Sequence, residues 1–207
     1  MTQVHYIFDP MCGWCYGATS LIQTLVNLPG IELHLHPGGM MERTTLDASF
    51  RQHILEADQR IAQMTGQEFG EGYIDRIRSG QPLILDSYLT TQAILAAGIA
   101  GKSQFEMLKR IQQAHYVDGQ TVADPVLLAQ LAQTAGLDSV AWQQAMDQAG
   151  ETVIATIEQT RSLMHQAGLG GFPSLLLEQD GELRSVPVSQ YYGRPADWQA
   201  LWQSIIE

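Results

Sequence analysis

The sequence predicts an α/β fold in which a helical region interrupts a small β-sheet. Strand signals occur over residues 4–36 and again over residues 174–186, whereas the residues between them carry helical patterns. A chain of 207 residues with 45% hydrophobic residues can bury a substantial core. We expect one domain formed by residues 1–43 and 151–207, with an inserted helical domain over residues 44–150.

The N-terminal segment predicts a strand, a helix and a second strand. Val4–Phe8 is a short β-branched and aromatic run, which is typical of a buried strand. An apolar face at helical spacing follows and ends at Pro29-Gly30. Ile31–His36 alternates apolar and polar residues, as a half-buried strand does. This order predicts a βαβ unit with parallel strands.

The middle of the chain predicts a bundle of about four or five helices and no strand. One of these helices would begin at Asp124-Pro125, because aspartate caps a helix and proline suits its first position. The first apolar stripe consists of Phe50, Ile54, Ala57, Ile61 and Met64.

Strand signals return near the C-terminus. A helix over about Glu151–Ala167 leads to a predicted strand at Ser174–Glu178. Gln179-Asp180-Gly181 predicts a hairpin turn, and Glu182–Val186 predicts the partner strand. Pro195–Ile206 predicts a final helix with an apolar side.

The charge and the N-terminus limit the classes of partner and the compartment. Eleven basic and 22 acidic residues give a net charge of −11, which repels nucleic acid and anionic lipid. The chain lacks both a signal-peptide pattern and a run of the roughly 18 apolar residues that a membrane span requires. With Met1 as the natural start, we expect a cytoplasmic protein, in which persistent structural disulfides are rare.

The chain has two cysteines, Cys12 and Cys15, separated by Gly13 and Trp14. A C-x-x-C sequence beside a βαβ pattern is typical of a redox-active pair. Cys12 would lie at the N-terminus of the first helix, where the helix dipole stabilises a thiolate by up to ~2 kcal/mol. Cys15, one turn further on, would face inward and act as the resolving thiol.

Two other interpretations of the pair are a structural disulfide and a metal site. A disulfide across so short a loop would stabilise the fold by only roughly 2 kcal/mol in the entropy model. A zinc site would need His34 and His36 as further ligands, but zinc-binding histidines usually have at least three residues between them. We therefore expect no metal, and we expect these histidines to lie on a polar face or edge of the sheet.

Four stretches of the chain together resemble a known family. The sequence FDPMCGWCYG, the long helical segment, GFPS before a strand and VPVSQYYGRPADW are similar to the DsbA-like branch of the thioredoxin superfamily, in particular its cytoplasmic, FrnE-like members. The resemblance implies an α/β, thioredoxin-like fold with a large helical insertion and thiol–disulfide exchange as the activity. It also implies Cys12 as the nucleophile and Pro173 as a cis-proline that faces the two sulfurs. Without the resemblance, Pro173 could equally begin an edge strand in the trans form.

Other residues near the pair have alternative roles. Gly13-Trp14 stands where strongly oxidising members of this family carry Pro-His, so we expect a less oxidising disulfide. Trp14 and Phe172 would form an apolar platform for substrate, unless either packs into the core. Asp9 could accept a proton during exchange or could cap the helix. The loop before the last helix adds further candidates for a groove, which are Tyr191, Tyr192 and Arg194.

Three classes of function follow from this pattern. The first is a thiol–disulfide oxidoreductase or isomerase that acts on proteins or small thiols, without a bound cofactor and with glutathione as a possible co-substrate. The second is a glutathione-dependent enzyme of the kappa-class transferase or 2-hydroxychromene-2-carboxylate isomerase type. Those enzymes typically have serine in place of Cys12 and lack Cys15, so the retained pair argues against them. The third is a binding module or chaperone, which gives no reason for either cysteine.

Overall fold

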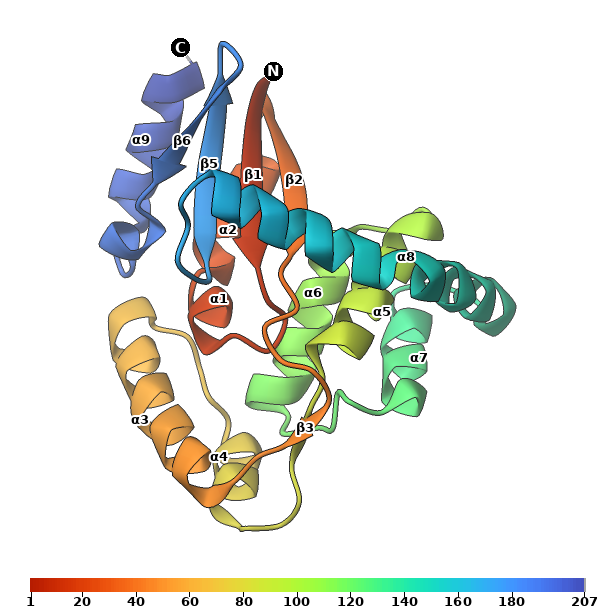
Figure 1. Cartoon of the computed structure of the whole chain (residues 1–207). Helices are drawn as coiled ribbons and strands as arrows, with labels where there is room; N and C mark the ends of the chain where they lie inside the picture. The colour runs from red at the N-terminus through yellow and green to blue at the C-terminus, as the bar shows by residue number, and fades with distance from the viewer. Residues whose placement is uncertain (207) are drawn as a thin grey trace.

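The computed structural model describes residues 1–206, and its centre is a four-stranded sheet (Figure 1). The strand order is β2-β1-β5-β6, with β1 at Thr2–Phe8, β2 at Ile31–Pro37, β5 at Ser174–Gln179 and β6 at Glu182–Val186. β1 and β2 are parallel, whereas β5 pairs antiparallel with both β1 and β6. The predicted βαβ unit and the predicted C-terminal hairpin are therefore confirmed.

The helix predicted between the first two strands is divided in two. α1 spans Gly13–Gly17, and α2 spans Thr19–Asn27. Ala18 separates them, because its N–H bonds to the carbonyl oxygens of Trp14 and Cys15 in a tightened last turn. The pair of cysteines thus lies on a short helix of its own at the end of β1.

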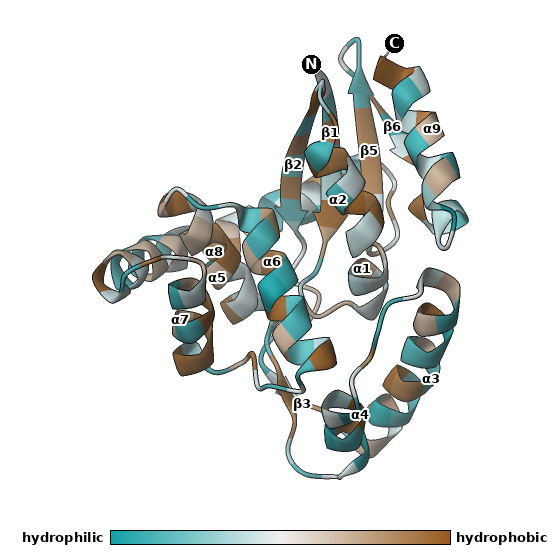
Figure 2. Cartoon of the chain, turned by 180° about the vertical axis from the view of Figure 1, so that it is seen from behind, coloured by the Kyte–Doolittle hydropathy of each residue, from teal (hydrophilic) through white to brown (hydrophobic). Residues whose placement is uncertain are grey.

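The two faces of the sheet are covered by different helices. Val4, Tyr6 and Phe8 of β1 are buried in one hydrophobic cluster with residues of α2 and of α9, which spans Pro195–Ile206. The indole N–H of Trp198 on α9 donates to the carbonyl oxygen of Leu21 at 2.8 Å, which joins the two helices on this face. Figure 2 shows α2 in front of the sheet, and Figure 1 shows α8 across the opposite face.

The segment between β2 and β5 contains most of the helices. Their bounds are α3 Ala48–Thr65, α4 Glu71–Arg78, α5 Ser87–Ile99, α6 Gln104–Gln112, the π-helical turn Gln113–Val117, α7 Pro125–Thr134 and α8 Ser139–Gln166. The expectation of no strand was wrong, since Thr44–Thr45 (β3) and Ile84–Leu85 (β4) form a short antiparallel pair. Within residues 1–206, no helix has the length and apolar character needed to cross a membrane.

α8 begins earlier than the sequence pattern indicates. Its first residue is Ser139 rather than Glu151, because the side chain of Asp138 accepts hydrogen bonds from two amides of the first turn. Gly150 does not end the helix, and its missing side chain leaves room for Gln92 of α5. The predicted boundary between residues 150 and 151 falls inside α8. The division of the chain into two domains stays a prediction.

The buried face of α3 also differs from the predicted apolar stripe. Ile61 of the predicted stripe is buried, but Phe50 and Met64 are 36% and 47% exposed, and Arg51 and Asp58 are buried instead. The guanidinium of Arg51 donates to main-chain carbonyl oxygens at the end of α4 and just after it. Polar contacts therefore help to fix this side of α3, and hydrophobic periodicity does not detect them.

Candidate active site

Cys12 lies where β1 leads into α1 and is the N-cap residue of that helix. Its Sγ accepts a hydrogen bond from the Cys15 amide at 3.3 Å, and it lies 3.7 Å from the carbonyl oxygen of Phe172. Both cysteines are free thiols. Cys12 is 6% exposed and Cys15 is 0% exposed, so the two thiols differ in access to solvent.

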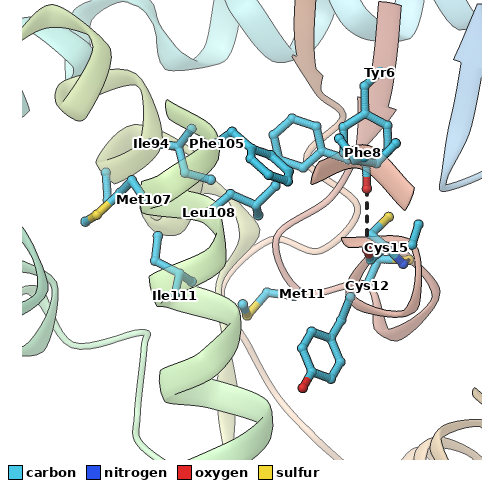
Figure 3. Close-up of a cluster of buried hydrophobic side chains, with 14 of the residues drawn as sticks. Tyr6, Phe8, Met11, Cys12, Cys15, Ile94, Phe105, Met107, Leu108 and Ile111 are labelled. Atoms are coloured by element: carbon cyan, nitrogen blue, oxygen red, sulfur yellow. Dashed lines mark hydrogen bonds between the residues drawn. The ribbon is translucent and has the colours of Figure 1, made fainter. Parts of the chain in front are cut away.

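Cys15 is enclosed by the residues that precede the pair. The Asp9 amide donates to its Sγ at 3.4 Å, and the Tyr6 hydroxyl donates to its carbonyl oxygen at the same distance. Figure 3 shows this second bond and the apolar cluster, contributed by β1 and α6 among other elements, next to the pair. Burial raises the pKa of the Cys15 thiol well above its usual value, and the neighbouring Cys12 raises it further. Cys15 is therefore held as a protonated thiol at neutral pH.

The loop before β5 faces Cys12. The Phe172–Pro173 peptide bond is cis, and both residues are half-buried. The Phe172 ring packs on the backbone of Gly38, where an added Cβ would lie only 2.1 Å from the ring. Gly38 thus lets this ring pack closely against the end of β2. Phe172 is both a core residue, on its Gly38 side, and a surface residue, on its outer side.

A pocket of about 330 Å³ is lined by Trp14, which lies between the cysteines, and by the loop that faces Cys12, although neither cysteine lines it. Trp14, Phe172, Pro173 and Ser174 line one part of it, and Tyr192 and Met64 line another. The Trp14 ring stacks on Tyr192 with centroids 5.7 Å apart, and the Tyr192 hydroxyl donates to the Trp14 carbonyl oxygen at 3.1 Å. The pocket has the size of a small-molecule site and combines apolar walls with hydroxyl groups.

Asp9 binds three separate segments through its buried carboxylate. One oxygen accepts the Met11 amide at 2.8 Å and the Ser87 hydroxyl at 2.7 Å, and the other accepts the Met40 amide at 2.5 Å. Burial raises the pKa of Asp9, although these hydrogen bonds and the charge of Arg161 oppose that shift. Asp9 does not cap α1, because the N-cap residue is Cys12, whose sulfur accepts the hydrogen bond from the Cys15 amide. It joins the cysteine loop to the segment after β2 and to the start of α5.

Gly13 provides the contact between the cysteine pair and α3. A Cβ at this position would lie 2.8 Å from Oδ1 of Asp58 and 3.0 Å from Ile61. The other carboxylate oxygen of Asp58 accepts the Tyr73 hydroxyl at 2.7 Å. Burial raises the pKa of Asp58 to about 6. The glycine between the cysteines therefore lets a buried carboxyl group of α3 approach the cysteine pair, a feature that the sequence pattern does not reveal.

Replacing Asp58 with asparagine should stabilise the protein at neutral pH. Because folding raises the pKa of Asp58 from 3.8 to about 6, its contribution to stability is complete below pH 3.8 and is lost as the pH rises through 6. At pH 7.5 the D58N variant should gain up to about 3 kcal/mol, since a tenfold change in proton affinity is worth about 1.4 kcal/mol. The amide oxygen can still accept the Tyr73 hydroxyl.

The measurement is urea unfolding of the D58N variant and the wild type between pH 4 and pH 8. The stabilisation should shrink below pH 6 and vanish near pH 4. Asp75→Asn, at an exposed position on α4, is the matched control and should leave the pH profile unchanged. A D58N effect that is constant over this range would contradict the assignment.

The two histidines of β2 lie away from the cysteines, on the sheet. His36 Nε2 is 3.0 Å from Nδ1 of His5, and the other ring nitrogen of His5 lies 3.1 Å from a Glu178 oxygen. His34 stacks on His5 with ring centroids 5.0 Å apart. In residues 1–206, no group of three or more His, Cys, Asp or Glu side chains is arranged to hold a metal ion. Through the contacts with His5 and Glu178, the histidines form a polar cluster on the sheet.

Comparison with protein-family models matches residues 3–191 to the DSBA-like thioredoxin domain. The chain belongs to this family, and it is a disulfide oxidoreductase of the DsbA type. The predicted fold class, a thioredoxin-like α/β fold with a large helical insertion, is confirmed. A comparison with curated protein sequences gives no match.

Among solved structures, the chain is similar to the cytosolic disulfide reductase DsbM from Pseudomonas aeruginosa. The TM-score is 0.91 at 38% identity, and the alignment covers 99% of this chain and 98% of DsbM. A structure of the same reductase with GSH gives a TM-score of 0.90 at 36% identity, with the same coverage. A 2-hydroxychromene-2-carboxylate isomerase gives 0.61 at 12% identity, covering 98% of this chain and 97% of the isomerase. That last similarity shows the fold alone.

Proposed function

We propose that the protein is a thiol–disulfide reductase in which Cys12 attacks the substrate and Cys15 resolves the intermediate. The observation that carries this proposal is the asymmetry of the pair. Cys12 Sγ accepts a hydrogen bond from the Cys15 amide and lies beside the Phe172 carbonyl oxygen. Cys15, in contrast, is fully buried. A thiolate is the attacking species in exchange. The better nucleophile is therefore the sulfur of Cys12, which accepts the amide hydrogen bond and is the more accessible of the two.

The reaction proceeds in two exchanges. The Cys12 thiolate attacks one sulfur of the substrate disulfide, a Cys12–substrate disulfide forms, and the other half of the substrate leaves as a thiolate. Cys15 then gives up its proton to water and attacks Cys12 Sγ, which releases the second half as a thiolate. The substrate gains two electrons, and the protein ends with a Cys12–Cys15 disulfide. An external thiol must reduce that disulfide before the next cycle.

The substrate class that we propose is a disulfide containing glutathione. The pocket beside the pair has walls formed by Trp14 and Tyr192 and hydroxyl groups from Ser174 and Ser189, which suits a short peptide with polar ends. The carbonyl of Phe172 next to Cys12 is available to an extended peptide backbone. The solved structure of DsbM with GSH supports this choice.

We further propose that the protein works in the cytoplasm, where thiols are kept reduced and a disulfide pair is used transiently. The cytosolic description of the similar reductase DsbM supports this location. The partners would then be protein or small-molecule disulfides, with glutathione as the co-substrate that restores the two thiols. Nucleic acid and anionic membranes are not expected partners, because the chain carries a net charge of −11.

The experiment that tests the proposal is an equilibrium titration of the Cys12–Cys15 pair against glutathione buffers, with free thiols trapped and counted. We expect a reduction potential between about −120 and about −270 mV, in the lower half of that range as suits a reductase. A pair that stays bridged far below about −300 mV would be structural instead. A pair that never forms a bridge would favour the transferase-type or binding functions.

A further inference from the structure

A short segment after β2 touches both sides of the redox site. This segment, Gly38–Met41, runs from the end of β2 towards β3. The Gly38 amide donates to the Phe8 carbonyl oxygen at 2.8 Å, and the Met40 amide donates to the Asp9 carboxylate at 2.5 Å. These bonds join the Gly38–Met41 segment to the loop that carries the cysteines.

The same segment supports the substrate side of the site. The Phe172 ring lies so close to Gly38 that a Cβ there would meet it at 2.1 Å. Phe172 in turn supplies the carbonyl oxygen next to Cys12 Sγ. A shift of Gly38 would therefore move the Phe172 ring, and with it the backbone that a substrate would pair with.

Helix α8 holds the segment from its other side. Arg161 Nε donates to the Gly38 carbonyl oxygen at 3.1 Å, and Arg161 Nη2 donates to that of Gly39 at 2.6 Å. Gly39 has a φ of +61° and packs against Ile157 of α8, one turn before Arg161. Two bonds from one charged guanidinium fix both the position and the direction of these carbonyls. Arg161 is otherwise an exposed residue on α8.

The far end of the segment has a separate anchor. The Met41 amide donates to the Ser87 hydroxyl at 3.2 Å, and the Ser87 amide donates back to the Met41 carbonyl oxygen at 2.9 Å. Loss of the Arg161 bonds should consequently loosen Gly38 and Gly39 without releasing the whole segment. The positive charge of Arg161 also lowers the pKa of Asp9, against the larger effect of burial.

We propose that Arg161 is a positioning residue, which fixes Gly38 and Gly39 and thereby holds Phe172 where a disulfide substrate binds. The proposal rests on the proposed function, because it assigns Arg161 to the substrate side of that reaction. Arg161 has no hydrogen bond to either cysteine among the bonds of residues 1–206. Its loss should weaken substrate binding while the chemistry of the Cys12–Cys15 pair stays the same.

The test compares the variants R161Q and R161K with the wild type, using glutathione disulfide as the probe. Oxidation of the reduced protein is followed by stopped-flow tryptophan fluorescence, since Trp14 lies between the cysteines. R161Q should raise the half-saturating concentration about five- to tenfold and leave the limiting rate within about twofold. The half-saturating concentration of R161K should lie between those of the wild type and R161Q, because lysine keeps the charge but cannot donate two hydrogen bonds in a fixed geometry. Glu158→Gln, exposed on the same helix, is the matched control and should match the wild type.

A second readout does not depend on the activity. Amide hydrogen exchange of Met40 and Gly38 in the reduced protein should be about tenfold faster in R161Q than in the wild type. If wild-type protein fails to react with glutathione disulfide, the proposed function is wrong, and the exchange data alone then decide whether Arg161 holds the segment. Unchanged half-saturation and unchanged exchange in R161Q would overturn the positioning role. The role would also be overturned if R161Q lowered the limiting rate and shifted the equilibrium constant for forming the Cys12–Cys15 disulfide by the same factor.

Discussion

Replacing Cys12 with serine is expected to abolish thiol–disulfide exchange, whereas replacing Cys15 with serine is expected to stop it halfway. A serine hydroxyl is not ionised at neutral pH, so C12S should lose at least about a thousandfold in rate. In C15S the Cys12 thiol remains at the start of α1, and only the thiol that would release the intermediate is missing. Because Cys12 caps α1 through Sγ, and serine is also a good cap, C12S should retain its fold.

The measurement uses a glutathionylated peptide as substrate, with mass spectrometry of the protein after quenching. C15S should accumulate one glutathionyl group on Cys12 in about one equivalent, while C12S should carry none. The wild type should carry an internal disulfide and no adduct. If C15S turned over at the wild-type rate, the resolving role of Cys15 would be wrong, and external glutathione would resolve the intermediate. If C12S kept full exchange activity, Cys15 rather than Cys12 would be the attacking thiol.

The parts of the site that were predictable are those encoded by adjacent residues. Cys12 and Cys15 are separated by one helical turn, so their placement at the start of a helix followed from the strand that ends at Phe8. Pro173 precedes β5 directly, and its role rested on a resemblance of the whole pattern rather than on the residue itself. For the cysteines, by contrast, a few consecutive residues determine the local geometry.

The contacts that connect the site to the helical segment were not predictable from the sequence. Ser87 and Arg161 reach Asp9 and Gly38 from positions more than 70 residues away in the chain, and nothing around them distinguishes them from other polar residues. The approach of Asp58 to Gly13 has the same character. Such pairs depend on how α3, α5 and α8 pack, and hydrophobic periodicity records only which face is apolar.

Periodicity located the elements better than it located their ends and faces. α9 was predicted with its bounds, because Trp198 and Trp202 supply a strong buried stripe between a proline and the chain end. α8 was predicted too short, because Gly150 resembles a helix end in the sequence but packs against Gln92 in the structure. The energetic cost of a glycine within a helix is about 1 kcal/mol, which tertiary contacts readily offset.

Asp9→Ala is expected to destabilise the fold by about 3–5 kcal/mol, since it removes the acceptor of three hydrogen bonds in the interior and each unsatisfied buried donor costs about 1–3 kcal/mol. The donors are the amides of Met11 and Met40 and the hydroxyl of Ser87. Ser87 is fully buried, as is Asp9, so water cannot easily replace the carboxylate. Typical domains unfold at a cost of about 5–15 kcal/mol, so the variant would lose a large part of its stability.

Asp9→Asn separates the effect of charge from that of hydrogen bonding. Burial raises the pKa of Asp9, so removing its charge relieves part of the cost of desolvation at neutral pH. However, asparagine turns one of the two acceptor oxygens into a donor, opposite either the Met40 amide or the Met11 amide and Ser87 hydroxyl. D9N should therefore fall between the wild type and D9A in urea unfolding. Ser20→Ala, an exposed hydroxyl on α2, is the control for loss of a polar side chain.

The same variants connect stability to the accessibility of the cysteine pair. The Asp9 amide donates to Cys15 Sγ, and the Asp9 side chain fixes the loop on which that amide lies. Loss of the side chain should free the loop and expose Cys15 through local opening. Cys15 of D9A should therefore react with an alkylating reagent at least about tenfold faster than Cys15 of the wild type under native conditions. Ser87→Ala removes one of the three bonds and should show a smaller effect in the same direction. If D9A unfolded at the wild-type urea concentration and Cys15 stayed protected, Asp9 would not be what ties the cysteine loop to the helical segment.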